Sequence, residues 1–230
     1  MLARGCQVKV IVRATENLPE NASSHSNLPV VHASILDLGA AEMARHLVSC
    51  STLVSCLGHN LSIKGMFGSP RRLVTDATRR LCDAVKAGNP QKPVKFILMN
   101  TTGNSNRDLN EPVSFGQKCV IWLLRLLLPP HADNEEAADY LRVEVGARDG
   151  TIEWVVVRPD GLVDEDETTE YALYPSPIRS AIFDAGTTSR INVAQFMSEL
   201  IVDDDLWDVW KGKMPVIYNQ ESHCAPGDKN

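Results

Sequence analysis

The chain has 230 residues, of which 43% are hydrophobic and 23% are charged, and its formal net charge is −6. This composition is typical of one soluble globular domain, and the negative charge argues against a nucleic-acid-binding surface. The start of the chain does not resemble a signal peptide, and the six cysteines form no Cys-x-x-Cys pair or zinc-ligand cluster, so we interpret them as reduced thiols of a cytoplasmic protein without a metal site.

Helical and strand patterns alternate along the chain. Six short apolar runs are predicted to be strands: Val8–Val12, Val30–Ala33, Thr52–Leu57, Val94–Met99, Ile152–Val157 and Pro215–Tyr218. Near-continuous hydrophobicity is typical of strands that are covered on both faces. The pattern therefore predicts an α/β fold with a doubly wound, mostly parallel sheet and helices on both faces.

Two helices carry recognisable start signals. Ser69-Pro70 is predicted to be an N-cap followed by proline at the first helical position, and Gly88-Asn89-Pro90 is predicted to end that helix. Asp133, with Glu136 three residues later, resembles a capping box. It is predicted to open a helix that runs to about Gly146.

The longest apolar stretch runs from Cys119 to Leu128 and is closed by Pro129-Pro130. It has about half the length that a bilayer crossing needs. We interpret it as a helix buried against the sheet; a helix that lies on a membrane is the alternative.

Two polar segments are predicted to be loops. The first, Thr15–Leu28, is rich in Asn, Ser and Pro, and the second, Asp164–Thr169, is strongly acidic. We interpret the acidic run as solvated, because it lacks the spacing and the glycine of a calcium loop. Residues after about 220 are predicted to be a disordered tail.

The start of the chain resembles the second half of a βαβ unit in a dinucleotide-binding fold. Residues 2–13 have the pattern of a helix end, a glycine stop, a short strand and a basic residue, Arg13. No earlier strand and no Gly-x-Gly-x-x-Gly turn is present, although the first strand is central in the 3-2-1-4-5-6 order of this fold. We expect its neighbours to pair directly, the sheet to split, or another segment to fill the slot. A truncated product or an incorrectly assigned start would explain the pattern, as would a genuinely short protein.

Six segments together carry a resemblance that spans residues 2 to about 219. They are Val8–Arg13, Ser34–Leu38, Val54–Gly58, Phe96–Gly103, Trp154–Leu162 and Thr188–Ala194. In order and spacing they resemble the atypical short-chain dehydrogenase/reductases, specifically the NmrA-like, NAD(P)-binding group that includes biliverdin reductase B-type proteins. The resemblance implies a single NAD(P)-binding, Rossmann-like domain over residues 1–230.

The resemblance also implies a cofactor groove along the strand ends. Arg13 would lie beside the ribose of the adenosine. At this position an acidic residue binds the 2′-hydroxyl of NAD, whereas a cation suits the 2′-phosphate of NADP, so NADP is favoured. Asp37 and Leu38 would contact the adenine. Leu57 and Gly58 would let the backbone approach the cofactor. The structural alternatives are a surface arginine, a helix cap at Asp37 and an ordinary turn glycine.

The substrate end of the groove would lie after the next two strands. Thr101 and Thr102 occupy the position where the family places a serine that binds the substrate; a plain hydroxyl-rich turn is the alternative. The backbone that meets the nicotinamide would come from four consecutive residues, Arg158, Pro159, Asp160 and Gly161. Arg158 could instead form an ion pair with the acidic loop that follows it.

The catalytic Tyr-x-x-x-Lys pair of the family is altered in this chain. The nearest match begins at Tyr140, and Glu144 takes the position of the lysine. In an α-helix this spacing places both side chains on one face, where a carboxylate raises the pKa of the tyrosine. Thr101 and Tyr140 are the predicted catalytic residues. Because of Glu144, the alternative for Tyr140 is a packing role.

The resemblance implies an NADP-dependent oxidoreductase whose substrate is a small carbonyl, enone or tetrapyrrole-like molecule. Cofactor binding is expected to be impaired in this chain, because the helix N-terminus that normally binds the pyrophosphate is absent. The alternative is an NAD(P)-sensing regulatory protein of the NmrA-like type, which would bind a protein partner without catalysis. A third interpretation is a degenerate fragment without a ligand. We expect no membrane and no nucleic-acid partner.

Overall fold

The computed structural model describes residues 1–16, 18, 25–60 and 62–220. Its main sheet has five strands in the order β3-β4-β5-β9-β7. These strands are β3 (Thr52–Ser55), β4 (Val94–Met99), β5 (Ile152–Pro159), β9 (Val216–Asn219) and β7 (Tyr171–Tyr174). Neighbouring strands are parallel except for β7, which is antiparallel to β9. The predicted α/β fold with a mostly parallel sheet is therefore confirmed.

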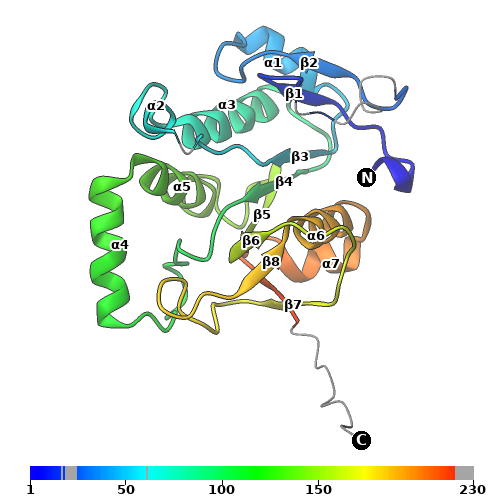
Figure 1. Ribbon diagram of the computed structural model, residues 1–230. Helices are drawn as coiled ribbons and strands as arrows, with labels where there is room; N and C mark the ends of the chain where they lie inside the picture. Colours follow the sequence, from blue (N-terminus) through cyan, green and yellow to red (C-terminus); the bar gives the residue numbers. More distant parts are fainter. Residues whose placement is uncertain (17, 19–24, 61, 221–230) are drawn as a thin grey trace, which may run out of the picture.

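Two strands near the N-terminus form a separate sheet. β1 (Val10–Val12) pairs in parallel with β2 (Val30–His32). Within the described ranges, β1 and β3 belong to different sheets and no strand joins them (Figure 1). Of the three outcomes expected for the slot between these strands, the structure shows a split sheet. A further parallel pair consists of β6 (Gly161–Val163) and β8 (Thr187–Ser189).

Helices cover both faces of the main sheet. Figure 1 shows α3 (Leu73–Gly88) and α5 (Pro129–Asp139) on one side of it, and α6 (Arg190–Val202) and α7 (Asp204–Trp210) on the other. α5 continues directly into a π-helix, η2 (Tyr140–Val145). The other helices are η1 (Leu2–Arg4), α1 (Ala40–Leu47), α2 (Ile63–Phe67) and α4 (Phe115–Leu127).

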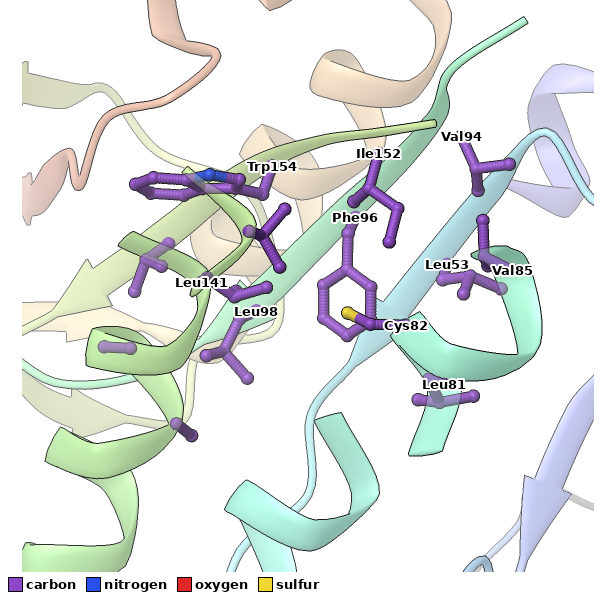
Figure 2. Packing of buried hydrophobic residues seen from close by; sticks show 14 of the residues in the cluster. Leu53, Leu81, Cys82, Val85, Val94, Phe96, Leu98, Leu141, Ile152 and Trp154 are labelled. Carbon is purple, nitrogen blue, oxygen red and sulfur yellow. The ribbon is translucent and has the colours of Figure 1, made fainter. Parts of the chain in front are cut away.

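Each face of the main sheet has its own hydrophobic core. Side chains alternate along a strand, so Phe96 and Leu98 of β4 pack toward α3 and α5, where they join Cys82 (Figure 2). Ile97, between them, packs on the opposite face in the cluster that includes Phe196 of α6. Burial on both faces explains why β4 and β5 have nearly continuous apolar sequences.

The beginning of α3 differs from the prediction. Its N-cap is Arg72, which makes no side-chain capping bond, and Ser69-Pro70 lies before the helix. The backbone N–H groups of Val74 and Thr75 donate instead to the carboxylate of Asp133, over 2.8 and 2.9 Å. The predicted capping box at Asp133 is therefore wrong, because this residue lies inside α5 and its carboxylate caps a neighbouring helix.

The prediction that residues 119–128 are buried against the sheet is also wrong. Most of them belong to α4, which packs on α5 at the outer edge of the molecule (Figure 1). Ile121 is buried, but Phe115, Trp122 and Leu126 are 83%, 62% and 67% exposed. In the described part of the chain, no helix is long and apolar enough to span a membrane.

The remaining predictions concern loops and cysteines. Residues 164–169 are exposed, as predicted for a solvated acidic loop. Parts of the loop predicted at residues 15–28, and the tail predicted after residue 220, lie outside the described residues. The five described cysteines carry free thiols, and Cys224 lies outside the described residues.

Candidate functional site

The carboxyl ends of β4 and β5 lie directly beside one another. The backbone N–H of Asn100 donates to the carbonyl of Val157 at 2.8 Å, and that of Thr102 donates to the carbonyl of Pro159 at 3.1 Å. The turn after β4 is thereby held against the end of β5. Ligands of open α/β sheets bind outside this edge, so the structure brings together the two predicted parts of the substrate end.

A pocket of about 470 Å³ lies at the carboxyl ends of β1 and β2. Arg13, His32 and Asp37 line it, together with Ser69 and Pro70 from the loop before α3. Nε2 of His32 lies 2.8 Å from the backbone carbonyl oxygen of Arg13, which links the ends of the two strands. The structure thus places Arg13 and Asp37, both predicted to bind the adenosine end of the cofactor, in one pocket.

The two residues predicted to contact the adenine have different environments. Asp37 is exposed, and the N-cap of α1 is Gly39, so the capping role left open for Asp37 is not observed. Leu38 is only 6% exposed and belongs to the hydrophobic core. Its side chain therefore supports the strand end from inside.

The backbone after β3 is exposed at Gly58. A Cβ added at Gly58 would meet no atom within 4 Å, so neither a neighbouring group nor a positive φ requires glycine there. Leu57 is half-buried and packs against the core. The role of Leu57 and Gly58 in cofactor binding therefore stays a prediction.

Asn100 organises the turn after β4. Its Oδ1 accepts hydrogen bonds from the N–H of Thr101, at 2.9 Å, and from the side-chain amide of Asn104. Its Nδ2 donates to the carbonyl of Asn134 on α5 at 2.9 Å. Oγ1 of Thr101 accepts from the N–H of Gly103 at 3.3 Å. The hydroxyl of Thr101 is thus held at this edge by an accepted bond, and its proton can still be donated.

Arg158 lies in the protein interior. Its guanidinium donates to the carbonyls of Met214 and Asn104, at 2.8 and 2.9 Å, and to the carboxylate of Glu111 at 2.8 Å. The side chain is 0% exposed, so this guanidinium is used by the fold and cannot contact a ligand from solvent. Its ion-pair partner is Glu111 and not the acidic loop at residues 164–167.

Asp160 is also used within the fold. Its carboxylate accepts the backbone N–H groups of Gly161, at 3.0 Å, and Gly186, at 2.8 Å. A Cβ on Gly161 would lie 3.0 Å from the carbonyl oxygen of Gly186, so the two segments approach closely. The carboxylate of Asp160 thus holds the segments that contain Gly161 and Gly186 together.

Tyr140 packs against α3. The guanidinium carbon of Arg79 lies 5.0 Å from the centre of its ring. Burial, followed by the neighbouring Cys82 and Asp83, raises the pKa of Tyr140 to about 12. Tyr140 begins the π-helix, whose i to i+5 bonding removes the α-helical stacking assumed for Glu144. The structure therefore favours the packing role that the sequence left open and does not bring Tyr140 to Thr101.

Sequence reasoning missed His131, in the first turn of α5. A Cβ on Gly103 would lie 3.5 Å from Cε1 of His131 and 3.8 Å from Oγ1 of Thr101, so both side chains border one point. Burial lowers the pKa of His131; the charge of Glu135 raises it and that of Arg125 lowers it. His131 and Glu135 are four residues apart on α5, the same spacing as in the Tyr-x-x-x-Lys pair, and Nε2 of His131 lies 4.0 Å from Oε1 of Glu135.

Comparison with known proteins identifies the family. A family model described as NAD(P)H-binding matches residues 1–204. The chain belongs to this NAD(P)H-binding family. No curated protein matches it by sequence.

Several solved structures of NAD(P)-binding proteins and oxidoreductases have the same fold as this protein. The oxidoreductase ylbE from Lactococcus lactis is 19% identical, with a TM-score of 0.61 over 94% of this chain and 80% of its own. A short-chain dehydrogenase/reductase from Veillonella parvula in complex with NADP is 13% identical, with a TM-score of 0.64 over 94% and 84%. A Rossmann-fold NAD(P)-binding family protein from Shigella flexneri is 17% identical, with a TM-score of 0.54 over 96% of both chains. These similarities confirm the Rossmann-like fold.

Proposed function

We propose that this NAD(P)H-binding protein is a cytoplasmic, NADP-dependent oxidoreductase of the atypical short-chain dehydrogenase/reductase type that acts on a small organic substrate. The observation that carries the proposal is Arg13 in the pocket at the ends of β1 and β2. When bound, the nicotinamide accepts or donates the hydride, so the task of the protein is to bind and orient the reactants.

Arg13 suits the 2′-phosphate that distinguishes NADP from NAD. Its side chain is exposed, and no carboxylate forms a salt bridge with it among the described residues. A guanidinium binds a phosphate through two parallel charge-assisted hydrogen bonds, each worth about 1.5–3 kcal/mol. Asp37, in the same pocket, can accept a hydrogen bond from the adenine amino group or from a ribose hydroxyl.

The other end of the groove has the features expected for the nicotinamide and the substrate. Gly58, after β3, is exposed, and the turn after β4 follows the strand that pairs with β3. There the hydroxyl of Thr101 can donate a hydrogen bond to a substrate oxygen, and the backbone of Pro159 and Gly161 forms the far side. This arrangement supports hydride transfer to or from a carbon that carries an oxygen.

Calorimetric titration with NADPH and NADH tests the proposal. NADPH should bind at least about tenfold more tightly than NADH, because one added phosphate contact is worth this much. Arg13→Glu should abolish the preference and leave NADH binding within about twofold. Arg148→Glu is a matched control, because this exposed arginine lies before β5, at the opposite edge of the sheet. Equal affinities, or no binding by the wild type at about 1 mM, contradict the proposal.

A second candidate function is an NAD(P)-sensing protein that binds another protein without catalysis. The exposed apolar side chains of α4, including Phe115, Trp122 and Leu126, favour it, because such a surface is typical of an interaction site. Hydride transfer to any substrate contradicts this second candidate. NADP-dependent binding of a partner, without turnover, supports it.

A further inference from the structure

Helix α4 presents an apolar side to solvent at the outer edge of the molecule (Figure 1). Its exposed side chains are large: Phe115 (83%), Trp122 (62%), Leu123 (46%), Leu126 (67%) and Leu127 (54%). Gln117 and Ile121, on the opposite side of the helix, are buried. Helix α4 is therefore anchored to the protein by one side only.

The loop before β8 extends this apolar surface. Oγ of Ser180 donates to Oε1 of Gln117 at 2.8 Å, and a Cβ on Gly116 would lie 3.6 Å from Cε2 of Phe183, which is 64% exposed. Phe183 and the five exposed side chains of α4 form what we call the α4 face. With roughly 150–250 Å² for each large apolar side chain, the α4 face exposes roughly 700 Å². The largest apolar patch on a typical monomer is only about 300–600 Å².

Four exposed residues form a stripe along the α4 face. They are Phe115, Cys119, Trp122 and Leu126, and we call them the α4 seam. Successive members are four, three and four residues apart. This is the spacing of the residues that pack between the helices of a coiled coil, so the α4 seam has the pattern of a helix that packs against another helix.

The α4 seam is complementary to itself when two copies run antiparallel. With a two-fold axis between Cys119 and Trp122, each Cys119 faces the Trp122 of the other copy, and each Phe115 faces Leu126. A small side chain then meets a large one in both central layers, which suits close packing. Parallel helices would instead pair Trp122 with Trp122 and Cys119 with Cys119, in layers of very unequal size.

The charges near the α4 face favour a second copy over a lipid surface. The chain has a net charge of −6, but residues 112–132 contain no Asp or Glu, so two such faces bring no carboxylates together. Lys118 and Arg125 are the cations of α4, and Arg125 already donates to both carboxylate oxygens of Glu135, over 2.5 and 2.7 Å. A helix that lies on an anionic membrane is rich in Lys and Arg beside its apolar side.

We propose that this protein forms a symmetric dimer in which two α4 helices pack antiparallel through the α4 seam. Two α4 faces contribute roughly 1,400 Å², within the roughly 1,200–2,000 Å² that specific, stable interfaces bury. The dimer does not depend on a bound cofactor. It also accounts for the exposed surface that otherwise favours the second candidate function.

Sedimentation equilibrium of the full chain tests the dimer. At about 100 µM the wild type should have about twice the mass of one chain, and Leu126→Glu should raise Kd at least about 100-fold, because an unpaired charge would be buried. The matched control is Val209→Glu, at a 53% exposed position of α7, and it should keep Kd within about twofold. A wild type that is monomeric at this concentration overturns the proposal, and so does a dimer that Leu126→Glu leaves intact.

A mixture of two variants tests the antiparallel arrangement. Phe115→Lys and Leu126→Glu should each be monomeric at about 100 µM. In the mixture, the introduced ammonium and carboxylate face each other, while the native Phe115 and Leu126 pair at the other end of the seam. The mixture should therefore dimerise at least about tenfold more tightly than either variant alone. No recovery on mixing contradicts the antiparallel seam.

Flotation with vesicles of phosphatidylserine and phosphatidylcholine tests the competing occupant. The dimeric wild type should not bind these vesicles, because its α4 faces cover each other. Vesicle binding by a wild type that stays monomeric, when Trp122→Glu abolishes that binding, would identify a lipid surface as the occupant and overturn the dimer. Circular dichroism should show the wild-type spectrum for all variants, since each substituted side chain is exposed in the single chain.

Discussion

Nε2 of His59 lies 2.7 Å from the carboxylate of Asp133, which joins the end of β3 to α5 across 74 residues of sequence. The same carboxylate accepts the N–H groups of Val74 and Thr75 and so completes the first turn of α3. One buried acidic side chain therefore connects two helices and a strand next to the candidate cofactor site.

Replacing Asp133 should destabilise the protein strongly. In Asp133→Ala, the His59 ring and two backbone N–H groups lose their acceptor in the interior, which should lower the free energy of unfolding by about 3–5 kcal/mol. Glu136→Ala, on the same helix, removes a largely exposed ion pair with Arg72 and should cost at most about 1 kcal/mol. Urea denaturation measures both, and a cost below 1 kcal/mol for Asp133→Ala contradicts this account.

The pH dependence of stability should include a contribution from Asp149. Burial alone would raise its pKa, but hydrogen bonds from Thr151, Lys86 and Ile152 lower it from 3.8 to about 2. A depressed folded-state pKa stabilises the protein above pH 3.8, and the effect disappears as the pH falls toward 2.

Asp149→Asn should therefore flatten the curve of unfolding free energy against pH between these two values, by about 1 kcal/mol after solvent screening. Asp164→Asn, whose side chain is 86% exposed, should leave the curve unchanged. An unaltered slope in Asp149→Asn would show that the carboxylate has the same pKa in the folded and unfolded states.

Truncation of two tryptophans should affect stability to very different extents. Trp207 is 2% exposed and donates from Nε1 to Glu153 at 2.6 Å, so Trp207→Ala should cost about 3–5 kcal/mol. Trp122 on α4 is 62% exposed, so Trp122→Ala should change the stability of the monomer by at most about 0.5 kcal/mol. Thermal denaturation of dilute, monomeric protein compares the two, and similar losses would mean that α4 is covered within a single chain.

The buried pair of Arg158 and Glu111 should show strong coupling. Arg158→Met leaves the carboxylate of Glu111 without its partner in the interior and should cost about 3–5 kcal/mol. The double variant Arg158→Met/Glu111→Leu should be more stable than Arg158→Met, because no uncompensated charge remains. A double-mutant cycle from urea denaturation measures the coupling, and additive losses would contradict it.

The strands of the sheet interior could be predicted because burial on both faces gives them a distinct composition. Val94–Met99 has the predicted bounds, whereas β6, β7 and β8 have three or four residues, many of them half-exposed, and were missed. Their positions depend on partners that are distant in sequence, such as Asn219 opposite Tyr171. Short strands of this kind carry too few apolar residues for a periodic signal.

The candidate site shows the same limit. Arg13 and Asp37 each follow a recognisable strand and line one pocket, while their contact with a cofactor stays a prediction. Asp133 matched a local capping pattern, but its carboxylate is used by another helix, which no local pattern reveals. Tyr140 was chosen by α-helical spacing in a segment that forms a π-helix. No local pattern indicates that His131 lies near Gly103, in the turn after β4.

The division between β1 and β3 separates the two ends of the proposed cofactor groove. The Arg13 pocket belongs to the two-stranded sheet, while Thr101 and Pro159 belong to the five-stranded sheet or the turn after β4. No continuous ladder of backbone hydrogen bonds links the two sheets among the described residues. Side-chain packing, which includes Ile11 and Leu38 in the main core, fixes the distance between the two ends. A dinucleotide that contacts both ends would crosslink the two sheets, so the cofactor would complete the architecture as well as the chemistry.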